Sequence, residues 1–278
     1  MSSDIRPSPI AGQWYSSDPA VLSLELDGYL SAARLPAING EIIAVVAPHA
    51  GYQYSGPVAA HAFAAIRDQR PELVAVISPM HHPYGEGFLT SGHAYYWTPL
   101  GTIPVDKEAV AGITKILHEE NRIDLHPVLN DPEHSLEIEL PFLQRIYSHK
   151  FSLLPIMVRD LSLTSCEALG KALFRVLDGR SVMVVISTDL SHFYTEREAN
   201  GYDTFMLNTI EGLSPERVLR AEMQGDGYAC GAGAVLAGLY YARLAGAVSG
   251  KILKYGTSGE RTGDHSSVVG YGAIALIK

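Results

Sequence analysis

The chain has 278 residues, of which 47% are hydrophobic and 18% charged, a composition typical of a globular protein. Its formal charge of −9 and its lack of any Lys/Arg cluster argue against nucleic-acid binding, which needs a basic face. No apolar stretch approaches the roughly 20 residues that a membrane-spanning helix requires.

Two further features indicate where the protein works. The first residues, MSSDIRPSPIAGQWYSSDP, lack the basic-then-apolar layout of a secretory signal peptide. Cys166 and Cys230 are the only cysteines, so a disulfide framework is excluded and a reduced environment is favoured. We therefore expect a cytoplasmic protein.

The first half of the chain alternates apolar runs with helical patterns. Pro57 suits the first turn of a helix, so we place a turn before it. The elements that we expect, in order, are a helix over 19–33, a strand over 42–47, a turn over 51–56, a helix over 57–66, a strand over 73–78, loops and short strands over 81–100, and an amphipathic helix over 106–119.

The second half continues the same alternation. We expect a short helix opening within 135–139, a strand over 151–158, a helix that includes 169–177, a strand over 182–187, helices over 195–211, 215–224 and 230–245, and strands over 251–255 and 267–276. The apolar runs are continuous rather than alternating, which is typical of strands buried on both faces of a parallel sheet. The pattern predicts a single α/β domain over residues 1–278.

A histidine follows three of the apolar runs. His49 follows residues 42–47, His81 follows 73–78, and His192 lies shortly after 182–187. Because parallel strands end at the same edge of a sheet, where α/β proteins bind their ligands, these side chains should converge on one crevice. His82 should point away from His81 because the two are adjacent.

Acidic residues accompany two histidines. Asp189 lies three residues before His192, where a carboxylate could fix the imidazole tautomer and raise its basicity. The segment DPEHSLE places His134 near the predicted crevice. We expect its carboxylates, Asp131, Glu133, Glu137 and Glu139, to be solvated or to cap a helix.

Cys230 is the more interesting of the two thiols. It lies at the expected amino end of a helix, where the backbone amides and the helix dipole favour a thiolate. Three interpretations of Cys230 stay open: a buried thiol, a metal ligand beside the histidines, or a nucleophile with His192 as its base. Several imidazoles and one thiolate suit Zn, Fe or Cu. Cys166 should be inert packing. Five other histidines, His61, His93, His118, His126 and His149, should lie on the surface or be hydrogen-bonded.

Together, these segments resemble the Memo family, the Memo-like protein B of the microbial AmmeMemoRadiSam grouping. The match covers AGQWY, APHAGYQYSG, the HH pair, TPLG, EHSLE with LPF, STDLSH, ACG and DHSSVVGYGAIAL, in order along essentially the whole chain. The resemblance implies a fold like that of class III extradiol dioxygenases, with a mostly parallel or mixed sheet sandwiched by helices.

The resemblance also implies a site. Its metal ligands fall on His49, His81 and Cys230, while Asp189, His192 and His134 match the family's other pocket residues. Trp14 matches an aromatic residue near the pocket. The dioxygenases hold iron with two histidines and a glutamate, whereas a thiolate here is softer. One transition-metal ion is implied, with Fe or Cu favoured and Zn also suitable.

Two functions follow from this resemblance. The first is a metal-dependent oxidoreductase acting on a small molecule or a modified residue, with His192 as acid/base, Asp189 orienting it, and His134 stabilising a bound anion or oxygen species. The second is a non-catalytic protein that binds a peptide or an anion on a vestigial dioxygenase scaffold, framed by Trp14, Tyr52 and Tyr54. Partner proteins of the AmmeMemoRadiSam grouping are further expected.

Overall fold

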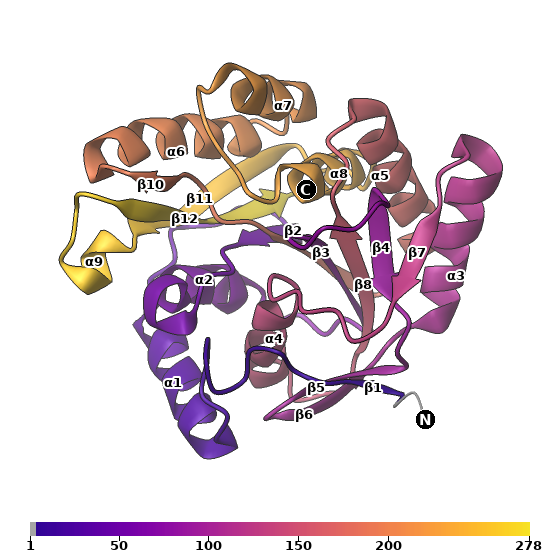
Figure 1. The fold of residues 1–278 in the computed structure, drawn as a ribbon, viewed down its shortest axis with the longest axis horizontal. Helices are drawn as coiled ribbons and strands as arrows, with labels where there is room; N and C mark the ends of the chain where they lie inside the picture. Colours follow the sequence, from indigo (N-terminus) through magenta and orange to yellow (C-terminus); the bar gives the residue numbers. More distant parts are fainter. Residues whose placement is uncertain (1–3) are drawn as a thin grey trace.

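The computed structural model describes residues 4–278. A large β-sheet lies at the centre of this structure (Figure 1). Its strands are β2 (Ile42–Ala47), β3 (Leu73–Pro79), β4 (Phe88–Ser91), β7 (Leu125–Val128), β8 (Ser152–Val158), β9 (Val182–Ser187), β10 (His192–Tyr194), β11 (Ser249–Thr257) and β12 (Val268–Ile277). A small second sheet consists of β1 (Ile5–Arg6), β5 (Tyr95–Thr98) and β6 (Gly101–Pro104).

The large sheet is mixed, with a parallel centre. Its order is β10-β12-β2-β9-β3-β8-β4-β7, and β11 pairs with β12. Strands β2, β9, β3 and β8 are mutually parallel, whereas β12 and β4 pair antiparallel with β2 and β8. This α/β arrangement confirms the predicted fold class and agrees with the dioxygenase-like fold that the resemblance implied.

Helices cover both faces of the sheet. They are α1 (Pro19–Ala32), α2 (Tyr52–Ile66), α3 (Lys107–Ile116), α4 (Leu140–Ile146), α5 (Leu163–Leu177), α6 (Glu196–Glu211), α7 (Pro215–Gln224), α8 (Ala232–Leu244) and the short α9 (Gly259–Thr262). A π-helical turn, Leu117–Asn121, extends α3, and a 3-10 turn, Glu137–Glu139, precedes α4. Within the described residues, no helix is both long and apolar enough to cross a membrane.

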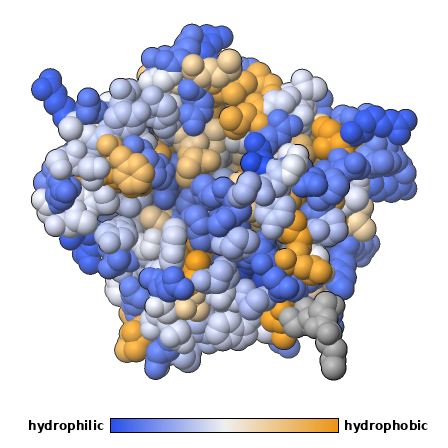
Figure 2. All heavy atoms as spheres, in the orientation of Figure 1, coloured by the Kyte–Doolittle hydropathy of each residue, from blue (hydrophilic) through white to orange (hydrophobic). Residues whose placement is uncertain are grey.

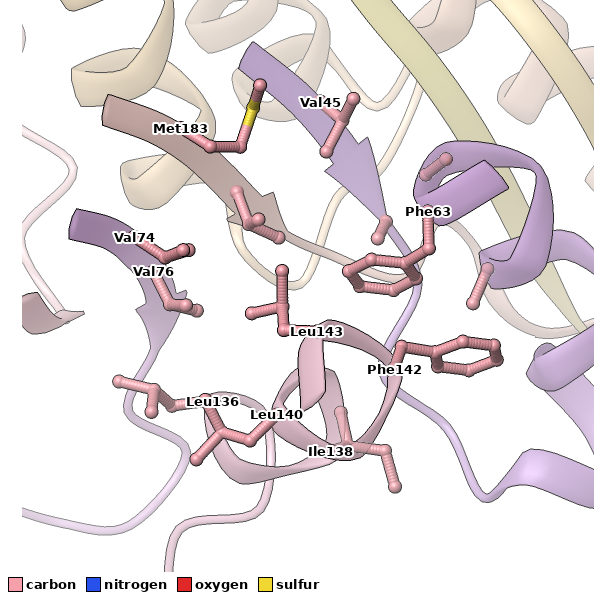
Figure 3. Close-up of a cluster of buried hydrophobic side chains, with 14 of the residues drawn as sticks. Val45, Phe63, Val74, Val76, Leu136, Ile138, Leu140, Phe142, Leu143 and Met183 are labelled. Atoms are coloured by element: carbon pink, nitrogen blue, oxygen red, sulfur yellow. The ribbon is translucent and has the colours of Figure 1, made fainter. Parts of the chain in front are cut away.

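Two hydrophobic cores lie on opposite faces of the sheet. Val45, Val74 and Met183 point to the face covered by α1, α2 and α4, where they pack near Phe63 and Phe142 (Figure 3). The alternate side chains of the same strands point to the face covered by α3 and α5–α8. Burial on both faces explains why the central strands are apolar along most of their length, with serines only at or near their ends.

Helix α2 begins earlier than predicted. The expected turn at 51–56 is wrong, because the helix starts at Tyr52 and carries Pro57 in its interior. Proline has no N–H to donate to the carbonyl of Gln53, one turn earlier. The side chain of Arg261 supplies that hydrogen bond instead, from Nε to the Gln53 oxygen at 2.9 Å. A contact between residues distant in sequence therefore provides the hydrogen bond that the proline cannot donate.

Candidate metal centre

Three imidazoles meet beyond the carboxyl ends of the central strands. His49 follows β2 and His81 follows β3, as predicted, while His134 comes from the loop before the Glu137–Glu139 turn. The ring centroids are 5.2 Å apart for His49 and His81, 5.4 Å for His49 and His134, and 4.8 Å for His81 and His134. Parallel strand ends thus bring together histidines that are distant in sequence.

Glu133 orients two of these rings. Its Oε1 atom accepts a hydrogen bond from His81 Nδ1 at 3.0 Å and lies 3.2 Å from His134 Nδ1. The same oxygen accepts the backbone N–H groups of His134 and Ser135, each at 2.9 Å. Because Glu133 occupies the Nδ1 side of both rings, their Nε2 atoms are left to bind a ligand.

Ser187 orients the third ring. Its Oγ atom lies 2.9 Å from His49 Nδ1, 2.8 Å from the Ser135 carbonyl oxygen and 2.6 Å from Glu139 Oε1. A hydroxyl has one hydrogen to donate. If it donates to the Ser135 carbonyl, which can only accept, both His49 Nδ1 and Glu139 must donate to Ser187. This arrangement satisfies every group at Ser187 and makes His49 Nε2 the acceptor nitrogen of the ring.

The electrostatic environment keeps two of the imidazoles neutral. Burial, together with the neighbouring His134 and His81, holds the pKa of His49 well below its usual value. Burial lowers the pKa of His134 to about 4 despite the adjacent Glu133 carboxylate. Burial alone would raise the pKa of Glu133, but its hydrogen bond and charge interaction with His81 lower it further than burial raises it. Neutral imidazoles beside an ionised carboxylate are suited to metal ligation.

His49, His81 and His134 form a three-donor group able to hold a metal ion. Their ligand atoms all lie within 4.8 Å of one another. Metal–nitrogen bonds of about 2.0–2.1 Å require donors closer than about 4.2 Å, so the rings would move together around a bound ion. The donor set and the carboxylate behind it therefore fit a transition metal.

Cys230 lies beside this group, next to one histidine. Its Sγ atom is 3.1 Å from His49 Nε2 and accepts the backbone N–H of Asp189 at 3.3 Å. Cys230 lies at the amino end of α8, as predicted, directly before the cap residue Gly231, but the expected thiolate is wrong. Burial instead raises the pKa of the thiol well above its usual value. In this environment, the S–H group donates to His49.

Asp189 supports His49 rather than His192. Its Oδ1 atom accepts the backbone N–H of His49 at 2.7 Å, and burial raises the pKa of its carboxyl to about 7. His192 places Nδ1 2.8 Å from the Leu190 carbonyl, so a backbone group fixes its tautomer. The prediction that Asp189 orients His192 is therefore wrong, because the carboxylate is bound by the His49 backbone and the imidazole by the Leu190 carbonyl.

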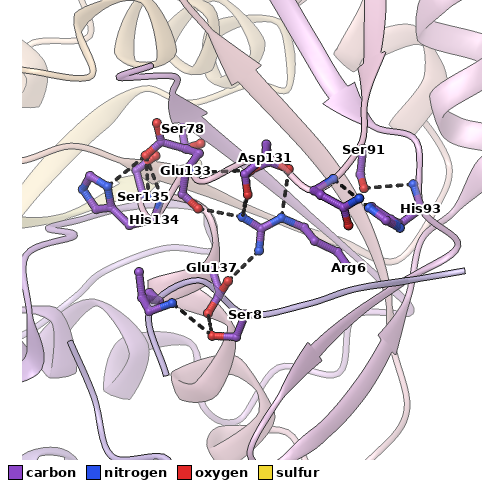
Figure 4. A network of polar contacts seen from close by, with 12 residues as sticks. Arg6, Ser8, Ser78, Ser91, His93, Asp131, Glu133, His134, Ser135 and Glu137 are labelled. Atoms are coloured by element: carbon purple, nitrogen blue, oxygen red, sulfur yellow. Dashed lines mark hydrogen bonds and ion pairs between the residues drawn. The ribbon is translucent and has the colours of Figure 1, made fainter. Parts of the chain in front are cut away.

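The carboxylates around His134 are buried, contrary to prediction. Figure 4 shows the cause: Arg6 reaches across from β1 and pairs with Asp131 Oδ1 at 2.7 Å and with Glu137 Oε2 at 2.5 Å. It also donates to the Glu133 carbonyl oxygen at 2.7 Å. One buried guanidinium thus pairs with two carboxylates that flank Glu133 and His134 in the sequence.

Trp14 and Tyr54 lie close to this histidine group. The ring of Trp14 lies 4.1 Å from that of His134, between centroids. Trp14 and Tyr54 line one pocket, next to Gly51 at the start of α2. Their assignment to substrate binding stays a prediction.

Comparison with known proteins identifies the family. A family model described as Memo-like protein matches residues 6–275. A MEMO1 family protein of Nitrosopumilus maritimus is 36% identical over 277 residues, covering 98% of this chain and 100% of the relative. Another, from Methanopyrus kandleri, is 33% identical over 282 residues and 98% of each chain is covered. The chain belongs to the Memo family.

A solved structure shares the fold of this Memo-family chain. The crystal structure of the uncharacterized protein JW3007 from Escherichia coli K12 matches with a TM-score of 0.56 and 12% identity, over 85% of this chain and 100% of that chain. At this identity, the likeness concerns the fold alone.

The structure groups the site residues of this Memo protein differently from the set that the resemblance implied. The implied ligands were His49, His81 and Cys230, whereas the three-donor group contains His134 in place of Cys230. Cys230 stays a predicted ligand because its sulfur lies within 3.1 Å of His49 Nε2. Sequence reasoning missed Ser187 and the orienting role of Glu133. The position of Ser187 at the end of the same strand that leads to His192 was the available signal.

Proposed function

We propose that this Memo-family protein is a non-haem, metal-dependent oxidoreductase that acts on a small molecule or a modified residue. The observation that carries the proposal is the group formed by His49, His81 and His134, whose donor atoms lie within 4.8 Å of one another. Glu133 and Ser187 hold the Nδ1 sides of all three rings, so the free nitrogens point away from those contacts.

The donor types favour iron or copper, with zinc also suitable. Imidazole nitrogens suit all three metals, and a nearby thiol adds a softer donor that favours copper. Once bound, iron or copper would supply one-electron redox chemistry to a substrate beside it.

His192 is suited to move a proton at this site. Its Nδ1–H donates to the Leu190 carbonyl, which leaves Nε2 as a proton acceptor. Burial lowers the pKa of His192, so the ring is a neutral base at neutral pH. His134, which packs against Trp14, serves in this proposal as a metal donor.

The alternative is a protein that binds a peptide or an anion without turnover. The missing carboxylate ligand favours it. The electrostatics of the site count against an anion, because the lowered pKa values of His49 and His134 leave these rings without positive charge near neutral pH. We therefore favour the enzyme. A cytoplasmic location, supported by two unpaired cysteines, and partners from the AmmeMemoRadiSam grouping complete the proposal.

Metal analysis of anaerobically purified protein tests this function. We expect the wild type and a control, His118→Ala, to bind about one iron or copper ion per chain. His118 is exposed and lies outside the histidine group. His49→Ala, His81→Ala and His134→Ala should each lower the metal affinity by at least about tenfold, because each removes one donor. Cys230→Ala decides whether the thiol is a fourth ligand.

Redox cycling completes the test. Bound iron or copper should change its absorption or EPR signal on anaerobic reduction and regain it in air. A metal content that survives replacement of all three histidines, or a bound metal that never changes oxidation state, would contradict the oxidoreductase.

A further inference from the structure

Helix α6 carries a carboxyl group on the face that it buries. Asp203 is 0% exposed, and the other buried residues of this helix include Ala199, Met206, Leu207 and Ile210. An acidic side chain at such a core position loses its hydration on folding, so it is retained only where its hydrogen bonds have a role. The contacts of Asp203 indicate what that role is.

The Asp203 carboxyl group is held between α6, β11 and β12. Its Oδ1 atom accepts the backbone N–H of Ser191 at 2.9 Å, and its Oδ2 atom accepts the hydroxyl of Tyr255 at 2.8 Å. A Cβ atom added to Gly270 of β12 would lie 1.8 Å from Oδ2. The absence of a side chain at Gly270 therefore gives the carboxyl group the space to reach Ser191.

One peptide group connects Asp203 to His192. The N–H of Ser191 and the C=O of Leu190 belong to the same planar, trans peptide, so they point in opposite directions. The N–H donates to Asp203, while the C=O lies 2.8 Å from Nδ1 of His192. Because a carbonyl oxygen can only accept, Nδ1 is the donor. Asp203 thus binds one end of the group whose other end orients His192.

The backbone after this peptide is strained. Phe193 has a φ of +67°, which is unfavourable for a bulky residue, and the register of β10 against β12 shifts here. Exposed apolar residues form separate groups on the mainly hydrophilic face that Figure 2 shows, and the Phe193 side chain is itself 76% exposed. Backbone contacts must therefore hold the strain: Leu190 N–H to the Gly270 oxygen and Gly270 N–H to the Ser191 oxygen, each at 2.9 Å, together with the Asp203 contact.

We propose that Asp203 is a positioning residue for His192 and acts through the peptide group between Leu190 and Ser191. A carboxyl oxygen that accepts the N–H polarises the peptide, which makes its carbonyl a stronger acceptor for the imidazole. Asp203 then has the orienting role that the sequence suggested for Asp189. The use of His192 as an acid/base rests on the proposed function, whereas its tautomer can be measured without any reaction.

NMR of protein labelled with ¹⁵N in histidine and in the backbone provides the test, with metal-free and zinc-loaded samples at about pH 8, where a histidine is neutral. His192→Gln assigns the ring signals. In the wild type, we expect one tautomer of His192, with its hydrogen on Nδ1, and a downfield Ser191 amide proton.

Three variants examine the connection. Asp203→Ala removes the acceptor, so both tautomers of His192 should appear and the Ser191 amide proton should move upfield. Asp203→Asn keeps an acceptor oxygen and should retain the Nδ1–H tautomer. Tyr255→Phe removes the contact at Oδ2 but leaves Oδ1 bound to Ser191, so it should retain this tautomer too.

Asp124→Ala is the matched control. Asp124 Oδ1 lies 2.7 Å from Nδ1 of His118, in an exposed pair. This variant also removes a carboxyl group that is linked to a histidine, but it should change the ring signals of His118 and leave those of His192 as they are.

A wild-type His192 with its hydrogen on Nε2, or with both tautomers, would overturn the inference. So would Asp203→Ala if it lost stability but kept the tautomer and the Ser191 shift, since the role of Asp203 would then be structural only. If Asp203→Ala does not fold, the wild type and Asp203→Asn decide, and loss of the tautomer in Asp203→Asn contradicts the inference.

These outcomes are independent of the metal, because none of the variants removes a histidine of the three-donor group. If the tautomer depends on Asp203 while metal analysis finds no metal site, the inference stands and the proposed function fails. If the metal behaves as expected and the tautomer does not depend on Asp203, the reverse holds.

Discussion

The buried carboxyl group of Glu139 influences His49 through the proton that it carries. Its Oε1 atom lies 2.6 Å from Ser187 Oγ, which in turn contacts His49. Burial, with a further contribution from the charge of Asp189, raises the pKa of Glu139 well above its usual value. A neutral Glu139 that donates to Ser187 keeps the hydrogen of His49 on Nδ1. This one proton therefore determines which nitrogen His49 offers to a ligand.

Replacement of Glu139 by glutamine tests whether the carboxyl group is protonated in the folded protein. In the unfolded chain, Glu139 ionises above its ordinary pKa of 4.5, whereas the folded protein retains the proton. The folded state then holds more protons, so its stability falls as the pH rises above 4.5. The amide that replaces the carboxyl in E139Q does not ionise in either state. We expect the stability of E139Q relative to wild type to increase by up to about 1.4 kcal/mol per pH unit.

Urea unfolding at several pH values between about 5 and 8 measures this difference. Glu119→Gln, at an exposed position, is the control and should show no such slope. A loss of stability in E139Q that is the same at every pH would mean that Glu139 is ionised in the fold. Metal affinity should survive in E139Q, because an amide can also donate to Ser187.

At the scale of elements, the short strand β1 holds the loop that carries His134. β1 pairs with β5 in the small sheet, and its Arg6 inserts between Asp131 and Glu137. The guanidinium and both carboxylates are almost fully buried. An ion pair of this kind adds little net stability, but removal of one partner leaves the other charges buried and uncompensated.

Arg6→Ala should therefore lower the free energy of unfolding by about 3–5 kcal/mol. Arg145→Ala is the matched control: Arg145 pairs with Asp27 at 2.7 Å at an exposed site, where the loss should be about 0–1 kcal/mol. Denaturant unfolding of both variants measures the two losses. Equal losses would contradict the view that Arg6 holds the loop through buried charge.

At the scale of the whole molecule, a bound metal would tie together strands that are far apart in sequence. The candidate donors follow β2 and β3 and lie in the loop before α4, so a single ion contacts both the sheet and the α4 side of the core. An ion that binds only the folded protein stabilises it by mass action.

Thermal unfolding should reveal this coupling. At a metal concentration about one hundred times the Kd, the stabilisation is about 2.7 kcal/mol. For a chain of this size, Tm should rise by roughly 5 °C. Differential scanning calorimetry with Fe(II), Cu or Zn measures the shift. A His49→Ala/His81→Ala double variant should lose it, and an equal shift in that variant would indicate binding elsewhere.

Much of the fold was predictable because its causes are local. Continuous apolar runs at 42–47, 73–78 and 182–187 predicted central strands, and the structure places β2, β3 and β9 there. The same reasoning placed His49 and His81 beyond strand ends. The start of helix α2 was mispredicted because Pro57 leaves the Gln53 carbonyl without its helical partner. The hydrogen bond that satisfies this carbonyl comes from Arg261, about 200 residues away.

The amino-acid sequence by itself determined the class of fold and the edge of the sheet at which the site lies, because side-chain periodicity reports burial directly. Only the tertiary structure decided that Glu133, Glu137 and Glu139 are buried. It likewise decided that His134 completes the three-donor group and that Asp189 serves His49. Each of these depends on partners distant in sequence, such as Arg6 and Ser187, and the cost of burying a charge is met only when such partners arrive.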